Sequence, residues 1–185
     1  MLHGNRHLAP EIVLLSIKTR NLSGKIFGLD RDRRQEISQR PLFGDAKLFL
    51  YLAARAQIVR EKILPALEKG KVVISDRFED STRAYQGFGR RISLRTIEEA
   101  SKLVRGTLKP DLTFVLDINT AKGLKRGGRH DRIEREALSF HKRVRQGYLT
   151  LARKEPKRIF LIHTNEPVEW VSQKVRERLE RVFGQ

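Results

Sequence analysis

Four short runs of β-branched and other apolar residues alternate along the chain with longer stretches of helical periodicity. The runs are EIVLLSIK at residues 11–18, KVVIS at 71–75, LTFVLDI at 112–118 and RIFLIH at 158–163. Short continuous apolar runs are typical of strands that are buried on both faces of a parallel sheet. Their alternation with helical stretches predicts an α/β fold, a parallel sheet flanked by helices.

The stretches between these runs carry apolar residues at helical spacing. The clearest are residues 45–70, DAKLFLYLAARAQIVREKILPALEKG, and residues 93–108, SLRTIEEASKLVRGTL. We expect Gly70 to end the first helix and Ser93 to cap the start of the second, because these residue types favour those positions. Pro110 then marks the turn into the third strand.

Length and composition narrow the class of protein. A chain of 185 residues without internal repeats or linkers predicts one domain, residues 1–185. No apolar run approaches the roughly 20 residues of a membrane helix, and the first residues lack the order of a signal peptide, so we expect a soluble, cytoplasmic protein. The chain has no cysteine and its five histidines show no metal-ligand spacing, which argues against disulfides and thiolate metal sites.

The chain is strongly basic, with 39 Lys and Arg against 22 Asp and Glu and a formal net charge of +17. Such an excess favours polyanionic partners, either nucleic acid or phosphorylated small molecules. A charged, solvated surface, as in heat-adapted proteins, explains the same composition. The basic residues are spread along the chain rather than gathered in a block, so both explanations stay open.

The segment DRFEDSTRAYQGFGR, residues 76–90, follows the apolar run KVVIS directly. Ligands of open α/β sheets bind beyond the carboxyl ends of the strands, which is where this segment begins. There Arg77 could bind a phosphate with two hydrogen bonds, and Asp76 could hold Mg²⁺ or its waters. A helix cap or a salt bridge is the commoner role of such a pair.

Two further patterns carry candidate chemistry. In RGGRHDRIERE, residues 126–136, a glycine pair lies between arginines that could close over a phosphoryl group; a solvated loop before a charged helix is the alternative. Tyr51 and Arg55 are four residues apart and therefore share a helical face. The ring could stack on a base and the guanidinium could bond its edge, although core packing plus a surface charge also accounts for the pair.

Together these segments resemble the thymidylate kinase family. SDRFEDSTRAYQGFGR is similar to the family signature DRY..S..AYQG.GR, and LFLYLAARAQ is similar to its LLLFLADRAQ. GGRHDRIERE, VRQGYLTLA and PDLTFVLDI fit its lid, the helix after the lid and its fourth strand. The resemblance covers roughly residues 42–185 and implies a P-loop NTPase fold of the nucleoside monophosphate kinase type.

The resemblance also implies roles for individual residues. Tyr51 falls where the family has a phenylalanine stacked on thymine, and Arg55 where an arginine bonds O4 of the base. Arg77 matches the arginine that grips the substrate phosphate, with Asp76 beside it near the metal. The other counterparts are the base and sugar contacts Thr82, Tyr85 and Gln86, the acid Glu136 near the sugar and metal, and the lid arginines Arg126, Arg129 and Arg132.

The family reaction transfers the γ-phosphoryl group of ATP to dTMP, giving dTDP, and requires Mg²⁺. Positioning and charge stabilisation carry such transfers, so no covalent nucleophile is expected. Stacking is indifferent to the identity of the base, and selectivity for thymine is therefore expected from the hydrogen bonds of Arg55. Family members commonly form homodimers through helices near the substrate. The segment DAKLFLYLAARAQIV is apolar enough to form such a dimer interface.

The chain departs from the family in its first part, residues 1–41. The loop GxxxxGK[ST], whose amides cradle the donor phosphates, does not occur in the printed sequence. LSGKIFG has Ile26 where Ser or Thr would bind Mg²⁺, and Thr19 where the first glycine belongs. Residues 19–28 fit better with the segment after the family's second strand, so we expect the first strand, phosphate loop and first helix to be missing. Ser139 also replaces a common acid.

Three interpretations of this departure stay open. The chain is a truncated or mis-started product of a real kinase, a relative that binds nucleotide without phosphorylating it, or a basic nucleic-acid-binding protein on the same scaffold. Lid arginines accelerate transfer only when the donor phosphates are held in line. We therefore expect the printed chain to have little or no dTMP kinase activity, although its dTMP half is largely intact.

Overall fold

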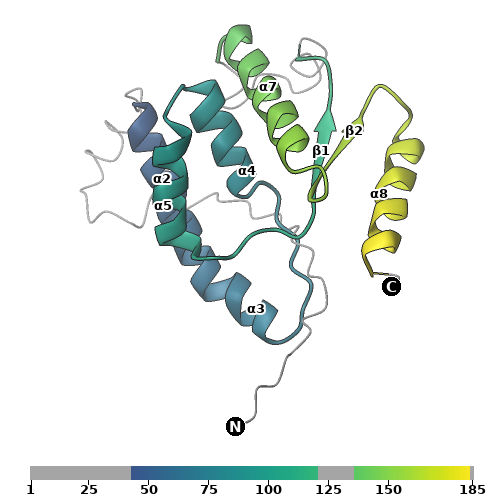
Figure 1. Ribbon diagram of the computed structural model, residues 1–185, viewed down its shortest axis with the longest axis horizontal. Coiled ribbons are helices and arrows are strands. Elements are labelled where there is room, and N and C mark those ends of the chain that lie inside the picture. Colours follow the sequence, from purple (N-terminus) through teal and green to yellow (C-terminus); the bar gives the residue numbers. More distant parts are fainter. Residues whose placement is uncertain (1–42, 121–135, 184–185) are drawn as a thin grey trace, which may run out of the picture.

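The computed structural model describes residues 43–120 and 136–183, shown as ribbon in Figure 1. The strand predicted at 11–18 and residues 126–135 of the predicted lid lie outside the described residues. None of the helices in the described part is long and apolar enough to cross a membrane.

The helix predicted at residues 45–70 is confirmed as one uninterrupted helical segment. It consists of α2 (Gly44–Ile58), a π-helical turn η1 (Val59–Ile63) and α3 (Leu64–Glu68). Its most deeply buried side chains are spaced four, seven and four residues apart and form one apolar stripe: Leu48, Leu52, Val59 and Ile63. The segment ends at Glu68 with Lys69 as its C-cap, one residue before the predicted Gly70. Gly70 follows with a φ of +66°, a left-handed conformation that glycine adopts without strain.

The helices that follow are short or strongly amphipathic. A single turn, α4 (Glu79–Thr82), continues into a second π-helix, η2 (Arg83–Gly89), and α5 (Leu94–Arg105) comes next. The predicted cap of α5 is confirmed, because Ser93 Oγ accepts a hydrogen bond from the Thr96 amide at 3.5 Å. The last two helices are α7 (Leu138–Lys154) and α8 (Val168–Phe183).

Two of the predicted strands form a parallel pair in the described part of the chain. β1 (Thr113–Asp117) and β2 (Ile159–His163) run in register from Thr113 opposite Ile159 to Asp117 opposite His163. Helix α7 packs on one side of the pair and α8 lies on the other (Figure 1). The prediction of parallel strands flanked by helices is confirmed for this region.

Residues 71–75, the apolar segment, do not form the predicted strand. No ladder joins them to either described strand, and a strand exists only through hydrogen bonds to a neighbour. Val73 is buried, whereas Val72 and Ile74 are 54% and 44% exposed. The expected burial on both faces also fails in β1, where Leu116 is 56% exposed, because no further described strand or helix covers it.

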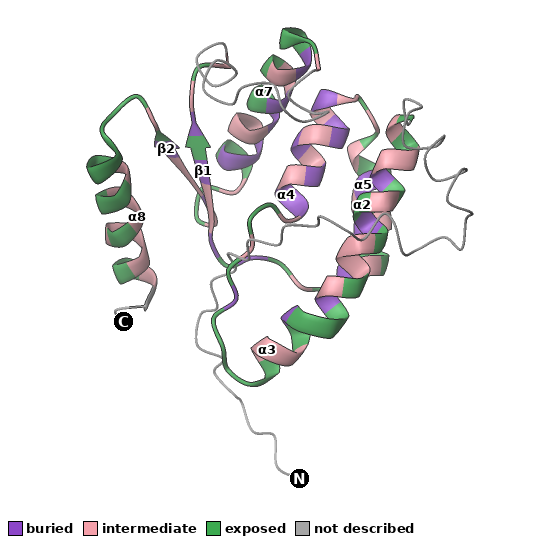
Figure 2. Cartoon of the chain, turned by 180° about the vertical axis from the view of Figure 1, so that it is seen from behind, coloured by how far each residue is buried: buried purple, intermediate pink, exposed green. Residues whose placement is uncertain are grey.

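The segment α4–η2 packs tightly between α5 and α7. Figure 2 shows buried residues where α4 faces α7. A Cβ at Gly87 would lie 2.4 Å from Leu94 Cδ2, and a Cβ at Gly89 would lie 2.6 Å from Phe140 Cε2. On the other helix, a Cβ at Gly147 would lie 2.8 Å from the Phe88 ring. These glycines therefore let three helices approach one another closely.

Candidate functional site

Residues 76–90, the signature segment, begin at the end of the apolar segment with a sharp turn at Arg77. Arg77 has a φ of +67°, and a side-chain-bearing residue in this conformation costs about 1–2 kcal/mol. Such strained residues cluster at functional sites. The turn brings the guanidinium carbon of Arg77 to 5.0 Å from the centre of the Tyr85 ring, so the arginine lies over η2.

Arg55 connects α2 to the signature segment. Its Nη1 donates to Thr82 Oγ1 at 2.8 Å, and its Nη2 donates to the Phe78 carbonyl at 2.9 Å. Its guanidinium also lies 4.9 Å from the Phe78 ring centre. Burial lowers the pKa of Arg55 to about 10, and the residue is still cationic at neutral pH. Arg55 is therefore not an isolated surface charge. Its hydrogen bond to Thr82 joins two of the predicted contacts of the nucleotide, Arg55 itself and Thr82.

The other predicted base contacts lie on the same two elements. Tyr51, one turn before Arg55, is 46% exposed and has ring surface available for stacking. Gln86 is buried, and its Oε1 has no hydrogen-bond partner among the described residues. Because burying an unpaired polar atom is unfavourable, the Gln86 amide has bonding capacity that a ligand could use.

Glu136 lies apart from Arg55, on the short segment before α7. Its Oε1 accepts from Arg90 Nη2 at 2.7 Å and lies 3.7 Å from Lys47 Nζ. A hollow of about 420 Å³ opens beside this cluster, and its lining includes Arg91 and Arg143. Sequence analysis missed these basic partners because they come from distant segments. The three predicted lid arginines, Arg126, Arg129 and Arg132, lie outside the described residues.

A largely buried ion network secures the signature segment near the starts of β1 and β2. Arg158 donates two hydrogen bonds to the Asp80 carboxylate, at 2.7 and 2.8 Å, and Thr113 Oγ1 donates to Asp80 at 3.0 Å. Arg158 also donates to Glu155 at 2.8 Å, and this hydrogen bond is the main reason that the pKa of Glu155 falls to about 2. Asp80 is therefore occupied in holding α4 against the starts of β1 and β2.

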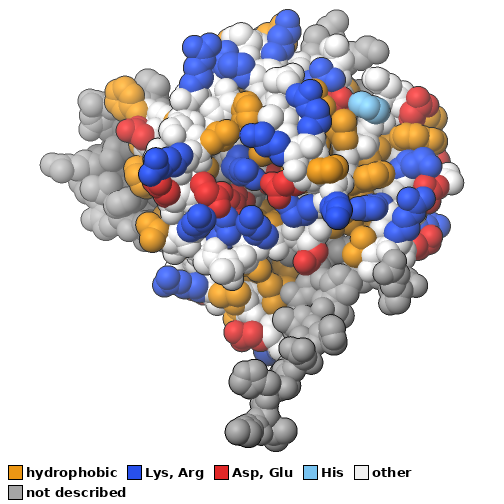
Figure 3. All heavy atoms as spheres, viewed as in Figure 1, with side chains coloured by type: hydrophobic (Ala, Val, Ile, Leu, Met, Phe, Trp, Pro, Cys, Tyr) orange, Lys and Arg blue, Asp and Glu red, His pale blue; other side chains and the backbone are white. Residues whose placement is uncertain are grey.

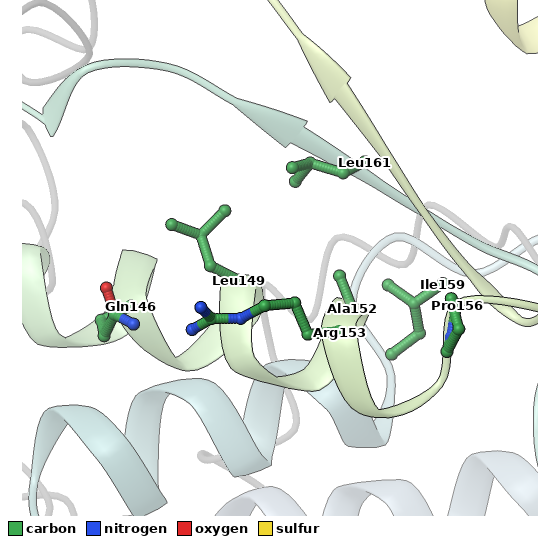
Figure 4. Close-up of a pocket in the computed structure, with 7 residues that line it drawn as sticks. All are labelled: Gln146, Leu149, Ala152, Arg153, Pro156, Ile159 and Leu161. Carbon is green, nitrogen blue, oxygen red and sulfur yellow. The ribbon is translucent and has the colours of Figure 1, made fainter.

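A second hollow, of about 430 Å³, lies between α7 and β2 and contains none of the predicted site residues. In Figure 4 its apolar side chains come from both elements and Arg153 lies along α7. The lining residues are Gln146, Leu149, Ala152, Arg153, Pro156, Ile159 and Leu161. With no carboxylate and a single cation in this lining, the hollow is a poor place for the phosphate and metal chemistry that the sequence predicts.

The positive charge is distributed rather than concentrated. Figure 3 shows Lys and Arg side chains scattered over the described part of the visible face, with acidic side chains between them. Several arginines pair internally, among them Arg158 with Asp80 and Arg145 with Asp117. The hydrogen bonds of Arg145 are the chief cause of a lowered pKa of Asp117. Part of the basic composition therefore serves ion pairs within the fold.

The fold and this site define a nucleoside monophosphate kinase class of α/β protein. A crystal structure of thymidylate kinase from Ehrlichia chaffeensis matches with a TM-score of 0.63 at 31% identity, covering 80% of this chain and 72% of that one. The model of the family described as thymidylate kinase matches residues 32–175. The chain belongs to the thymidylate kinase family.

Curated relatives agree with this membership. The thymidylate kinase of Kosmotoga olearia is 46% identical over 137 residues, covering 72% of this chain and 66% of the relative. That of Pelotomaculum thermopropionicum is 42% identical over 160 residues, covering 82% and 74%. The chain spans about two thirds of the length of the curated relatives it matches.

Proposed function

We propose that this chain carries the dTMP-binding half of a thymidylate kinase, whose reaction transfers the γ-phosphoryl group of ATP to dTMP and gives dTDP. The observation that carries the proposal is the bridge from Arg55 on α2 to Thr82 on α4. This bridge joins α2 to the signature segment, which together bear the predicted base contacts, next to the strained turn of Arg77.

Arg77 is suited to the phosphate of dTMP. Among the described residues no carboxylate forms an ion pair with it, and its planar guanidinium can donate two parallel hydrogen bonds to a phosphate. The Tyr85 ring supports one face of the guanidinium at 5.0 Å. The charged group is thus oriented without being neutralised.

Arg55, Tyr51 and Gln86 are suited to the thymine base. Thymine presents an acceptor at O4, where cytosine presents an amino donor, and thymine also offers an N3–H donor. Arg55 is a donor that lies beside Thr82 and would match O4, and Gln86 Oε1 is an acceptor without a partner among the described residues that would match N3–H. Stacking on Tyr51 would add about 1–3 kcal/mol by analogy with nucleic-acid systems.

The metal and dimer assignments rest mainly on the family. Mg²⁺ would neutralise charge on the transferring phosphoryl group, and the exposed Asp76 beside Arg77 fits a carboxylate that holds the ion or its waters. A homodimer through α2 is supported by Phe43, at the helix start, and Phe49, which are 82% and 63% exposed. A cytoplasmic location is likewise inferred from the family.

Calorimetric titration with dTMP and dCMP tests the proposed site. We expect dTMP to bind at least about tenfold more tightly, equivalent to roughly 1.4 kcal/mol, and Arg55→Gln to reduce this preference. Arg153→Gln is the matched control, because Arg153 lies on α7 and its hydrogen-bond partner is Thr150 of the same helix. Equal affinities for the two nucleotides in the unmodified chain would refute the base assignment.

Two further measurements separate the open interpretations. A coupled assay with ATP, Mg²⁺ and dTMP distinguishes a kinase from a relative that only binds, since kinases typically turn over about 1–100 times per second. The net charge of +17 supports nucleic acid as the competing partner. Oligonucleotide binding that weakens steeply with salt, without selective dTMP binding, would favour that alternative.

A further inference from the structure

Tyr148 lies on α7, outside the signature segment and outside the residues that family resemblance assigns to the site. Its hydroxyl donates a hydrogen bond to Ser81 Oγ on α4 at 2.7 Å. Burial is the main cause that raises the pKa of Tyr148 above its ordinary value. The phenol is therefore protonated at neutral pH and can act as a permanent donor.

The ring of Tyr148 also contacts Tyr85. The two ring centres are 6.3 Å apart with an interplanar angle of 80°, an edge-to-face arrangement. Phe140, also on α7, contacts the same Tyr85 ring at 6.1 Å. Tyr85 is thus held by two aromatic neighbours from one helix, and it in turn lies under the guanidinium of Arg77.

We propose that Tyr148 is a positioning residue for the phosphate end of the nucleotide site. Its hydrogen bond anchors Ser81 and its ring orients Tyr85, which holds the Arg77 guanidinium in place. The inference rests on the proposed function, because that function assigns Arg77 to the dTMP phosphate. Tyr148 itself needs no contact with the nucleotide.

The expected effect is larger for a ligand that carries the phosphate. Arg55 holds the base side through Thr82 and the Phe78 carbonyl, whereas Tyr148 contacts Ser81 and Tyr85. Loss of the hydroxyl should therefore weaken dTMP more than thymidine, which lacks the phosphate. A single neutral hydrogen bond corresponds to about a 2- to 10-fold change in affinity.

The test is a calorimetric comparison of dTMP and thymidine in four forms of the full chain: unmodified, Tyr148→Phe, Ser81→Ala and the double variant. We expect both single variants to weaken dTMP by about 2- to 10-fold and to weaken thymidine by a smaller factor, since Tyr85 is also a predicted contact of the base and sugar. The double variant should be no weaker than either single one, because both remove the same hydrogen bond. Thr150→Val removes a hydroxyl from the same helix and should change neither affinity.

Three outcomes would overturn the inference: an equal loss for both ligands, additive losses in the double variant, or no loss of dTMP affinity. A readout without nucleotide keeps this test separate from the proposed function. NMR should show the ring signals of Tyr85 shifting in Tyr148→Phe and not in Thr150→Val; unchanged Tyr85 signals contradict the positioning role. Failure of the unmodified chain to bind dTMP would refute the proposed function alone.

Discussion

The signature segment and the apolar segment are consecutive in sequence and differ sharply in how they are supported. In the signature segment, Thr82, Ala84 and Gln86 are each at most 5% exposed, and helices α5 and α7 pack against them. In the apolar segment, Val72 and Ile74 are 54% and 44% exposed and no described strand pairs with them. The residues that carry the candidate chemistry are thus secured by helices, not by the apolar segment that leads into them.

This difference shows what determines the geometry of the candidate site. Three kinds of contact hold the signature segment against neighbouring elements. They are the close helix contacts at Gly89 and Gly147, the hydrogen bond from Arg55 to Thr82, and the ion pair of Asp80 with Arg158. Each contact joins residues far apart in sequence. The site should therefore respond strongly to changes in these helix contacts and weakly to changes in the apolar segment.

The largest expected effect is at the ion network. Asp80→Ala leaves Arg158 largely buried without its main partner, and breaking a buried pair in this way costs about 3–5 kcal/mol. Urea denaturation measures the loss. Glu99→Ala is the control, because its pair with Arg95 is solvent-exposed and should contribute no more than about 1 kcal/mol. Similar losses in both variants would mean that Asp80 does not anchor the segment.

Arg77→Ala comes next and acts on binding rather than on folding. Hydrogen bonds to charged groups contribute about 1.5–3 kcal/mol, so dTMP affinity should fall about 10- to 100-fold while thymidine affinity changes little. Arg153→Ala is the control, since Arg153 lies on α7 and its hydrogen-bond partner is Thr150 of the same helix. Parallel losses for dTMP and thymidine in Arg77→Ala would indicate a structural role.

Gly147→Ala tests the close contact of α7 with η2. The new methyl group would meet the Phe88 ring at 2.8 Å, and such overpacking costs about 1–3 kcal/mol. Alanine otherwise favours a helix by up to about 1 kcal/mol over glycine. Thermal unfolding should therefore show a lower Tm for Gly147→Ala, but not for Gly44→Ala, where the nearest contact is an ordinary 3.5 Å. A raised Tm in both variants would contradict the tight packing.

The smallest effects are expected in the apolar segment. Val72→Thr and Ile74→Thr change exposed side chains and should each alter stability by less than about 0.5 kcal/mol. Val73→Thr, at the buried position between them, should destabilise by about 1–3 kcal/mol because it buries a hydroxyl group. If the outer positions prove as sensitive as Val73, the segment is covered in solution and the contrast with the signature segment disappears.

Sequence patterns correctly predicted the helices and strands that depend on residues close together in the chain. The apolar stripe of residues 45–70 predicted the long helix, and Ser93 predicted the cap of α5. The apolar runs LTFVLDI and RIFLIH predicted β1 and β2. The pattern failed for residues 71–75, because an apolar run indicates a strand without revealing whether a partner lies beside it. The shared face of Tyr51 and Arg55 was visible in their spacing.

The contacts that hold the site could not be predicted from the sequence, because the two residues of each contact are far apart in the chain. Asp80 and Arg158 are 78 residues apart, and Tyr148 and Ser81 are 67 apart. Family resemblance assigned roles to residues that would touch the nucleotide, and it left Tyr148 and the partners of Glu136 without any. The glycines of the signature segment were visible in sequence, but only the structure shows that Gly87 and Gly89 admit neighbouring side chains.

Amide hydrogen exchange with and without saturating dTMP tests most directly whether α2 and the signature segment form the nucleotide site. The account predicts slower exchange in α2 and in α4–η2, which carry Arg55, Thr82 and Tyr85, and unchanged exchange in β2 and α8. Protection confined to α7, β2 and the apolar hollow between them, or no protection anywhere at a concentration that saturates binding, would contradict it.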